Sequence, residues 1–293
     1  MTYQIISDGS CDLIKEYTEK NNVIVVPFYV SFDGENYYKE GIEIDHDEFY
    51  KKMIDEKCFP KSSLPSVQDY IDAFTPVVKE GKPIICICIT EKFSGSYQSA
   101  MNAANIVKED YPDAKITVIN SMVNTVLQGL LVNEVVKMRD NGLGYEETIE
   151  KIKEIIPSGR IIFTIANIEY LKQGGRIGKL LTFASDKLGI KPLITLKEGE
   201  IFPSGVTRNR AKSIKKVVEL TKSHFEKNKL NPKDYMFCVG TGITDDEAKE
   251  LAAMLEEALD IKIDFWSGRI GTTIGTHTGP YPIGTGFIRK YDA

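Results

Sequence analysis

One continuous apolar run, Ile84–Ile89, constrains the fold of this chain more than any other feature. Six apolar residues in a row between helical patterns are typical of a strand that is buried on both faces of a parallel sheet. Shorter apolar runs stand at Gln4–Ile6, Val23–Val30 and Ile116–Ile119, and Pro27 favours an edge position for the second of them. The first half of the chain therefore predicts an open, Rossmann-like parallel sheet.

Helical patterns alternate with these runs and predict helices on both faces of the sheet. Asp45 and Glu48 make a capping-box pattern at the start of one helix. Apolar spacing predicts three more helices, which begin near Ser66, Ser96 and Thr125. This β–α alternation is that of an α/β domain.

Turn residues indicate where this domain ends. A helical pattern over residues 145–155 precedes Pro157-Ser158-Gly159, so we expect one domain over residues 1–157 and a second over residues 158–293. The second half combines closely spaced strands with two long amphipathic helices, which predicts an α/β domain with a mixed sheet. The expected strands are Ile161–Ile165, Pro192–Leu196, Met236–Val239, Ile261–Phe265 and Gly284–Arg289, and the expected helices are Asn209–Lys227 and Asp245–Leu259.

Composition excludes several classes of protein. The chain has 293 residues, 42 of them acidic and 37 basic, and this mild negative charge argues against nucleic-acid binding. It contains no apolar run of about 18 residues and no signal-peptide pattern, so we expect no integral membrane contact. Five scattered cysteines fit a reducing, cytoplasmic location. Three histidines without an HExxH or CxxC motif predict neither a metal site nor a cofactor.

The segment Gly174–Lys179 looks like a phosphate-binding loop but fails on spacing. Gln173 stands where the first glycine is needed, and Leu180 stands where serine or threonine should follow the lysine. The glycines are better explained as the end of a short helix. Arg176 and Lys179 would then lie on an exposed turn, either as a docking patch or simply in solvent.

Paired serines follow two of the expected elements. Lys61–Ser66 contains Ser62 and Ser63, and Glu91–Tyr97 contains Ser94 and Ser96. Helix capping would explain one serine in each segment but not two. Since loops at the carboxyl edge of a parallel sheet bind ligands, hydroxyl donation to an anion is the preferred interpretation. Lys92 and Ser96 occupy the positions that a GxSxG nucleophile elbow reserves for glycine, so Ser94 is not expected to be an activated nucleophile.

His277 lies in a glycine- and threonine-rich segment, Ile270–Pro280. A histidine there can contact an anion, but a hydrogen-bonded structural histidine and a hinge are open alternatives. Two other motifs have plainer explanations. Cys86 and Cys88 share one face of a strand and are expected in the core, and Gly240–Gly242 is better explained as a strand-to-helix turn than as an anion site.

Six motifs in this order resemble the DegV family of bacterial fatty-acid-binding proteins, and the resemblance covers residues from about 3 to 291. The motifs are Ser7–Leu13, Ser62–Ser66, Ser94–Tyr97, Tyr170–Ile177, Lys191–Leu193 and Gly275–Pro280. The resemblance implies two α/β domains, one of them Rossmann-like, that enclose a long-chain fatty acid such as palmitate, stearate or oleate.

The resemblance also implies roles for particular residues. By position, Ser62 and Ser94 would hold the carboxylate, with Ser63 and Ser96 as neighbours and His277 close by. Some family members are the non-catalytic binding subunit of a fatty-acid kinase and present the acid to a separate ATP-binding protein. Arg176 and Arg208 would be candidates for contacts with the head group or with that kinase.

Two alternatives to lipid binding remain open at this stage. The expected fold also resembles the substrate-binding part of dihydroxyacetone kinase, which would make the chain an enzyme for a small carbonyl or phosphorylated substrate. Turnover by the isolated chain would favour that alternative. A regulatory or interaction protein is a third class, and the lack of a basic stripe counts against contact with DNA.

Overall fold

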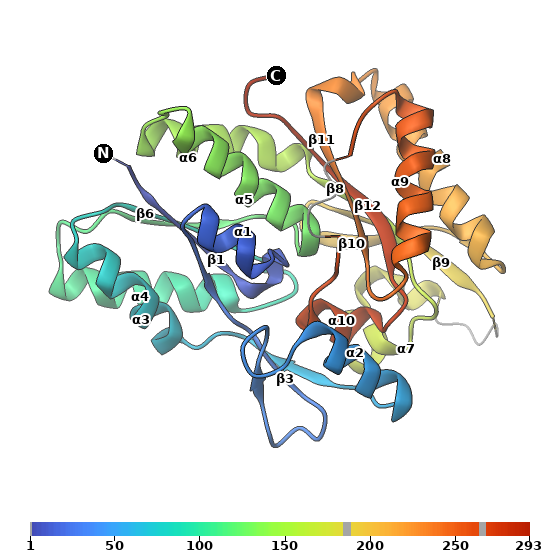
Figure 1. Ribbon diagram of the computed structural model, residues 1–293, viewed down its shortest axis with the longest axis horizontal. Helices are drawn as coiled ribbons and strands as arrows, with labels where there is room; N and C mark the ends of the chain where they lie inside the picture. Colours follow the sequence, from blue (N-terminus) through green and yellow to red (C-terminus); the bar gives the residue numbers. More distant parts are fainter. Residues whose placement is uncertain (1, 184–188, 264–267) are drawn as a thin grey trace.

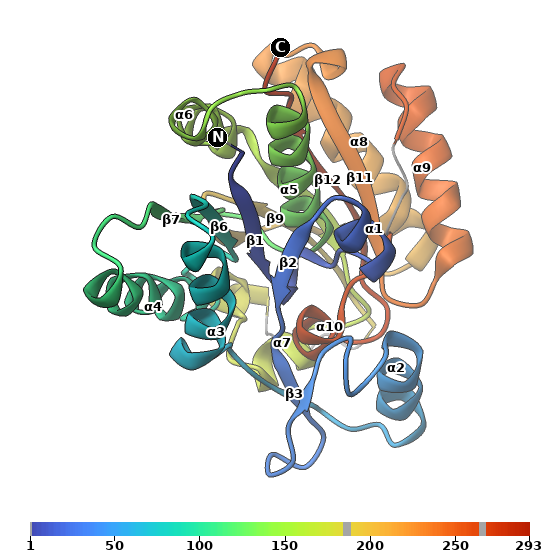
Figure 2. The ribbon, with the colours of Figure 1, turned by 60° about the vertical axis from the view of Figure 1, so that its left-hand side comes forward.

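Two β-sheets face each other across a layer of helices, and further helices cover their outer faces (Figure 1). The computed structural model describes residues 2–183, 189–263 and 268–293. Figure 2 shows the succession of layers from side to side: α3 and α4, the first sheet, α5, the second sheet, then α8 and α9. Both halves of the chain therefore contribute to one central layer.

The first sheet confirms the predicted parallel arrangement. Its order is β2-β1-β6-β7, and each neighbouring pair is parallel. Side chains alternate across it, so Ile6 and Cys86 face α3 and α4 while Ile5 and Ile85 face α5. The strands are β1 (Gln4–Asp8), β2 (Val23–Val26), β6 (Ile84–Cys88) and β7 (Ile116–Asn120).

The helices on the two faces also begin where the patterns predict. Asp45 caps the helix α2, and Ser66 and Asp69 form a reciprocal capping box at the start of α3. The outer face packs on α3 (Val67–Lys79) and α4 (Ser96–Asp110), and the inner face packs on α5 (Thr125–Asp140) and α6 (Tyr145–Ile155). Short α1 (Lys15–Lys20) and α2 (His46–Asp55) complete this half.

The sequence suggested one strand over the apolar run Val23–Val30, but the run forms two separate strands. Proline lacks the N–H that a ladder requires, so β2 ends before Pro27 and the chain turns into a second, small sheet. This antiparallel sheet has the order β4-β3-β5, from β3 (Tyr29–Ser31), β4 (Tyr38–Lys39) and β5 (Lys61–Ser63). Because β5 belongs to this small sheet, Ser62 and Ser63 lie on a strand and not in a loop.

The second large sheet has the order β10-β9-β8-β12-β11, and its named strands pair antiparallel, with one isolated parallel bridge between Thr241 and Arg269. Its outer face packs on α8 (Arg210–Asn228) and α9 (Asp245–Leu259). The strands are β8 (Arg160–Thr164), β9 (Lys191–Lys197), β10 (Glu200–Thr207), β11 (Tyr235–Thr241) and β12 (Ile283–Arg289).

One expectation for this half was wrong, and one strand was missed. The strand expected over Ile261–Phe265 is absent from its described part, residues 261–263, where Ile261 and Ile263 pack against the α8–α9 cluster; the remaining residues lie outside the described chain. The strand β10 was not predicted, because Pro203 and Gly205 interrupt its alternation and the ladder shifts register between them.

The helix α5 joins the two sheets. Nearly all of its residues are buried, because one side packs on β1 and the other on β11 and β12. Its core neighbours include Ile5 and Ile85 of the first sheet and Ile161 and Met236 of the second. The domain boundary after residue 157 stays a prediction, since this helix belongs to the hydrophobic cores of both halves.

Two short helices lie where the sheets approach each other. The helix α7 (Glu169–Gln173) ends at Gly174, as the glycine pair predicted. The helix α10 (Thr272–Thr278) carries His277, a residue that the sequence placed between turns. A 3₁₀ segment over Gly178–Phe183 follows α7.

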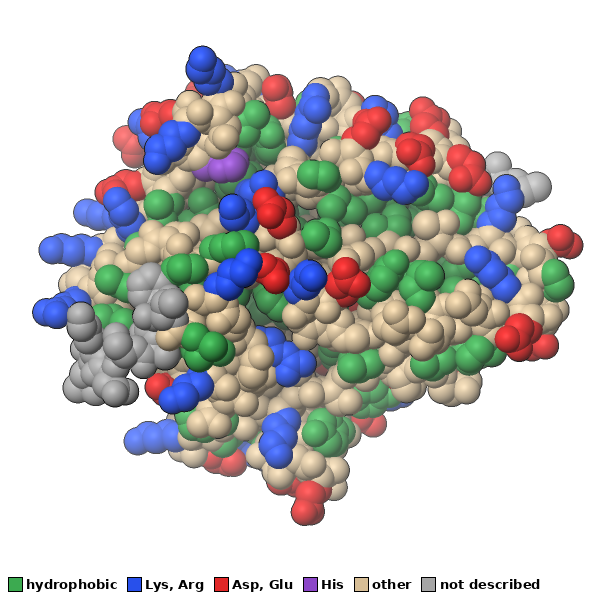
Figure 3. Space-filling model, turned by 180° about the vertical axis from the view of Figure 1, so that it is seen from behind, with side chains coloured by type: hydrophobic (Ala, Val, Ile, Leu, Met, Phe, Trp, Pro, Cys, Tyr) green, Lys and Arg blue, Asp and Glu red, His purple; other side chains and the backbone are tan. Residues whose placement is uncertain are grey.

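The molecular surface is mixed in charge on the side opposite to the view of Figure 1. Lys and Arg side chains alternate there with Asp and Glu, and apolar side chains lie between them (Figure 3). Among the described residues, no helix is both long and apolar enough to cross a membrane.

Gly284 tests how tightly the second sheet is packed. It pairs with Phe163, and a methyl group at Gly284 would overlap the backbone of Phe163 and the carbonyl oxygen of Ile162. We expect Gly284→Ala to lower the free energy of unfolding by about 3 kcal/mol, because strand backbone cannot move aside. The control, Gly144→Ala, meets open space and should cost about 1 kcal/mol or less. Urea unfolding measures both, and equal effects would contradict the prediction.

Candidate functional site

A cavity of about 210 Å³ lies between the two large sheets. For comparison, an apolar protein cavity of about 150 Å³ is large enough to bind benzene. Both halves of the chain line it, so it is closed only when they are packed together. Its apolar lining comes from Phe28, Ile89, Phe93, Val126, Ile161, Phe163, Leu171, Leu196, Ile201, Ile270 and Ile274.

Polar side chains from three separate segments also reach this cavity. Ser62 and Ser63 come from β5, Ser94 from the β6–α4 loop and His277 from α10. The Ser62 hydroxyl and Nε2 of His277 are 2.9 Å apart and hydrogen-bonded. The structure therefore brings together four residues that the sequence singled out, across 215 residues of chain between the bonded pair.

His277 is held in an apolar setting by its neighbours. Gly174 packs against the imidazole ring beside Nδ1, so closely that a side chain at position 174 would overlap the ring. Burial, with a smaller contribution from Arg176, lowers the pKa of His277 to about 4. The imidazole is therefore neutral near pH 7 and offers a single N–H. Its Nδ1 is buried and has no hydrogen-bond partner among the residues that the structure describes.

Ser96 does not reach the cavity, contrary to the expectation that it neighbours the ligand. Its side chain is fully buried beneath the β6–α4 loop, where its hydroxyl donates to Asp8 at 2.7 Å and lies 2.6 Å from the hydroxyl of Tyr70. The physical reason is that Ser96 begins α4 and points back into the sheet. Its backbone N–H donates to Oγ of Ser94 at 3.2 Å, so it orients the serine that does line the cavity.

Asp8 is a buried residue that sequence reasoning missed. Its carboxylate accepts hydrogen bonds from three side chains, Ser10, Ser96 and Gln128, and from the backbone N–H of Ile89. Burial raises the pKa of Asp8, and these donors oppose that shift. The available signal was its place at the carboxyl end of β1, directly before the Gly9-Ser10 turn.

Arg176 and Arg208 differ in position. The guanidinium of Arg176 donates to the carbonyl oxygens of Phe93 and Gly174, so it joins the serine loop to the end of α7, and it lines the cavity. Its side chain is otherwise exposed. Arg208 is exposed before α8 and does not line the cavity.

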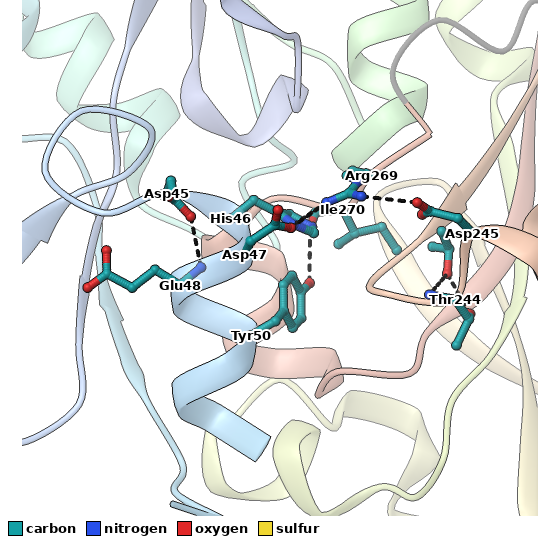
Figure 4. A network of polar contacts seen from close by, with 10 residues as sticks. Asp45, His46, Asp47, Glu48, Tyr50, Thr244, Asp245, Arg269 and Ile270 are labelled. Carbon is teal, nitrogen blue, oxygen red and sulfur yellow. Dashed lines mark hydrogen bonds and ion pairs between the residues drawn. The ribbon is translucent and has the colours of Figure 1, made fainter. Parts of the chain in front are cut away.

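A polar network fastens α2 to the segment that leads into α10 (Figure 4). The guanidinium of Arg269 bonds Asp47 of α2 on one side and Asp245 of α9 on the other. One turn further along α2, the Tyr50 hydroxyl donates to the carbonyl oxygen of Ile270 at 3.0 Å. The position of α10, and with it that of His277, thus depends on contacts from both halves of the chain.

The fold and this cavity define a class of protein: a two-sheet α/β protein with a mostly apolar chamber between the sheets and a few polar side chains in its lining. A family model described as an uncharacterised protein of the DegV family matches residues 2–290. A DegV domain-containing protein of Clostridium perfringens is 32% identical over 99% of this chain and 100% of its own length. The chain therefore belongs to the DegV family.

Solved structures agree with this assignment. A stearic-acid-binding protein from Eubacterium ventriosum is 48% identical, with a TM-score of 0.95 over 99% of both chains. A DegV family protein from Thermus thermophilus, described by its fatty acid binding, is 26% identical, with a TM-score of 0.87 over 99% of this chain and 100% of that one. The resemblance seen in the sequence motifs is confirmed.

The low pKa of His277 predicts a specific dependence of stability on pH. Because its pKa falls from 6.5 to about 4 on folding, the folded state resists protonation. Stability from this residue is complete above pH 6.5 and is lost as the pH falls toward 4, by at most about 3 kcal/mol. We expect wild type to lose more stability than His277→Gln between neutral pH and pH 4.5 in urea unfolding. Parallel profiles would contradict the assignment.

Proposed function

We propose that this chain binds a long-chain fatty acid in the cavity between its sheets, with the carboxylate at the end formed by Ser62, Ser94 and His277. The observation that carries the proposal is an apolar cavity with one cluster of neutral donors, in a chain 48% identical to a stearic-acid-binding protein. A fatty acid has the same division into an apolar tail and one polar end.

The tail supplies the affinity in this proposal. Each methylene that leaves water contributes about 0.8 kcal/mol, so roughly 15 of them contribute about 12 kcal/mol before costs. Loss of translational and chain freedom removes a large part of that sum. Apolar side chains from both sheets, such as Ile89, Phe163 and Leu196, would surround the tail.

The polar end sets the orientation of the ligand. A carboxylate taken from water needs several donors, or it takes up a proton. The hydroxyls of Ser62 and Ser94 can donate, and Ser63 lies beside them. The single N–H of neutral His277 can donate from Nε2 to the oxygen of Ser62, which leaves the Ser62 hydroxyl proton for the carboxylate. A neutral donor set favours a carboxylate over larger or multiply charged head groups, because it lacks a buried cation to balance further charge.

The same geometry favours binding over catalysis. Ser62 and His277 form a hydrogen-bonded pair that could suggest a nucleophile and its base. A working triad also needs a third group on the other ring nitrogen, and Nδ1 of His277 has no partner. We therefore assign the pair to ligand recognition and treat the chain as a non-catalytic lipid-binding protein. All five cysteines are free thiols, which fits a cytoplasmic location.

We further propose that the bound acid is presented to a fatty-acid kinase. A second, open cleft adjoins the cavity and shares with it Phe93, Ser94, Arg176 and Ile201. Lys92 and Lys179 also line this cleft, and Lys179 is paired with Glu200. An ATP-binding partner that docked there would find the carboxylate end of the ligand at the cleft floor, with Arg176 exposed beside it.

The double variant Ser62→Ala/Ser94→Ala tests the binding proposal. Each lost hydrogen bond to a charged group is worth about 1.5–3 kcal/mol, so palmitate affinity should fall at least tenfold while the thermal midpoint changes little. Ser99→Ala, on the same helix as Ser96 but outside the cavity, is the matched control. Isothermal titration with palmitate gives the affinities, and an unchanged affinity in the double variant would remove both serines from the site.

Mass spectrometry of the organic extract of purified protein tests the ligand class itself. A near-stoichiometric fatty acid would support the proposal, and its length would size the chamber. If the extract were blank and added palmitate and oleate also failed to bind, the lipid proposal would fall and turnover of small carbonyl substrates would be the next assay.

Arg176→Ala tests presentation to a kinase. We expect palmitate affinity within about threefold of wild type, because the guanidinium bonds backbone carbonyls and lies at the exposed rim. With a fatty-acid kinase ATP-binding subunit and ATP, acyl phosphate trapped by hydroxylamine should form at least tenfold more slowly. Lys172→Ala, an exposed cation on α7, should behave as wild type. Equal rates for the two variants would refute a role of Arg176 in the transfer.

A further inference from the structure

Two carboxyl groups, those of Asp12 and Glu40, lie directly behind the wall of the cavity; both residues are half-buried, and Oδ1 of Asp12 is shielded from solvent. Asp12 follows the 3₁₀ turn Gly9–Cys11, and Glu40 follows β4. A methyl group built at Gly271 would overlap an oxygen of each, Oδ1 of Asp12 and Oε1 of Glu40. Both oxygens therefore lie on the same side of Gly271, where a side chain would stand, at the start of α10.

Each carboxyl group is bonded to a residue that lines the cavity. The Thr125 hydroxyl donates to Oδ2 of Asp12 at 2.5 Å. Thr273 donates twice to Glu40, from its backbone N–H at 3.0 Å and from its hydroxyl at 2.7 Å. Since Thr125 and Thr273 are both cavity-lining residues, the acid pair supports the wall from behind.

Thr125 also carries backbone strain. Its φ is +51°, in the left-handed region that a β-branched residue rarely adopts. Such a conformation persists only where other contacts hold it, and the bond to Asp12 is the side-chain contact that does so here. A change at Asp12 is therefore transmitted to the wall through a residue that tends to relax.

No cation balances the two carboxyl groups. In the part of the chain that the structure describes, neither one forms an ion pair with lysine, arginine or histidine, and Oδ1 of Asp12 has no hydrogen-bond partner. The other titratable groups around them are Asp8 and Cys11 on the same segment, Tyr50 of α2 and, at the far end of α10, His277. The Tyr50 hydroxyl donates to Ile270, so it does not neutralise the pair.

We propose that Asp12 and Glu40 share one proton and in that state position Thr125 and α10 as one wall of the ligand cavity, and that loss of this proton loosens the wall. It follows that pH regulates the affinity for the ligand, and this part of the inference rests on the proposed fatty-acid binding. Oδ1 of Asp12 is the natural place for the proton, because it faces Glu40 and lacks any other partner. Both residues are thus positioning residues and do not touch the ligand.

Electrostatics supports the direction of the effect. Burial raises the pKa of Asp12, and the nearby charge of Glu40 raises it further. Burial likewise raises the pKa of Glu40, against the donors from α10. A raised folded pKa means that stability is complete at low pH and is lost as the pH rises through the folded pKa. While the folded pair keeps one extra proton, the unfolding equilibrium constant rises tenfold per pH unit.

Asp12→Asn is the decisive variant. An asparagine oxygen can still accept from Thr125, and its amide can donate toward Glu40 as the shared proton does, but it cannot lose that donor. We expect the palmitate affinity of wild type to fall between pH 6.5 and pH 8.5, and this fall should be at least threefold larger than the fall for Asp12→Asn over the same range. Urea unfolding should show the steeper loss of stability with pH in wild type only. Glu40→Gln repeats the test from the other side, and the exposed Asp113→Asn is the control.

A measurement on wild type alone covers the case in which neither variant folds. Infrared difference spectra between pH 6.5 and pH 9 should show the loss of one buried protonated carboxyl group. Absence of that band, or parallel pH profiles of wild type and Asp12→Asn, would overturn the acid pair while leaving fatty-acid binding intact. If palmitate bound at no pH but the stability profiles still diverged, the proposed function would fail and the shared proton would stand.

Discussion

The buried carboxylate of Asp8 is the interaction on which the polar end of the cavity depends. At this depth an unpaired carboxylate would cost several kcal/mol, so its burial requires the donors that converge on it. Two of them flank the β6–α4 loop, the backbone N–H of Ile89 at its start and the hydroxyl of Ser96 at the first residue of α4, and a third comes from Gln128 of α5. Asp8 therefore fixes where the loop that carries Ser94 leaves the sheet and how closely α5 approaches β1.

The acids at this edge of the sheet differ in how their charge is met. Asp8 receives four hydrogen bonds, whereas Asp12 meets the nearby charge of Glu40. Asp12 receives one side-chain bond, from Thr125, and keeps one oxygen unpartnered. The first arrangement suits a permanent anchor. The second places a titratable group beside a strained residue of the cavity wall, and the proposed link between pH and that wall rests on this arrangement.

Sequence patterns predicted the first sheet well because each buried strand must be continuously apolar and each helix must carry caps, and both signals are local. They failed where long-range contacts decide. The break at Pro27 is visible in the sequence. The sequence does not show that the chain then enters another sheet, in which Ser62 lies on β5. Ser94 and Ser96 cannot be told apart by the sequence pattern, yet Ser96 points into the sheet and Ser94 into the cavity. Apart from Ser10, the hydrogen-bond partners of Asp8 and Asp12 come from segments more than 80 residues away.

The neutral character of the donor set has a consequence for the proposed presentation to a kinase. A carboxylate in a tight pair with a buried cation would be held strongly but would lose electron density at the oxygen that must attack a phosphoryl group. In the proposed complex, serine hydroxyls and a neutral imidazole would hold it more weakly and would leave that oxygen more reactive. The cation nearest to this end, Arg176, bonds backbone carbonyls at the rim. There its charge is better placed for the incoming phosphoryl group than for the resting acid, so binding and activation need not compete for the same residue.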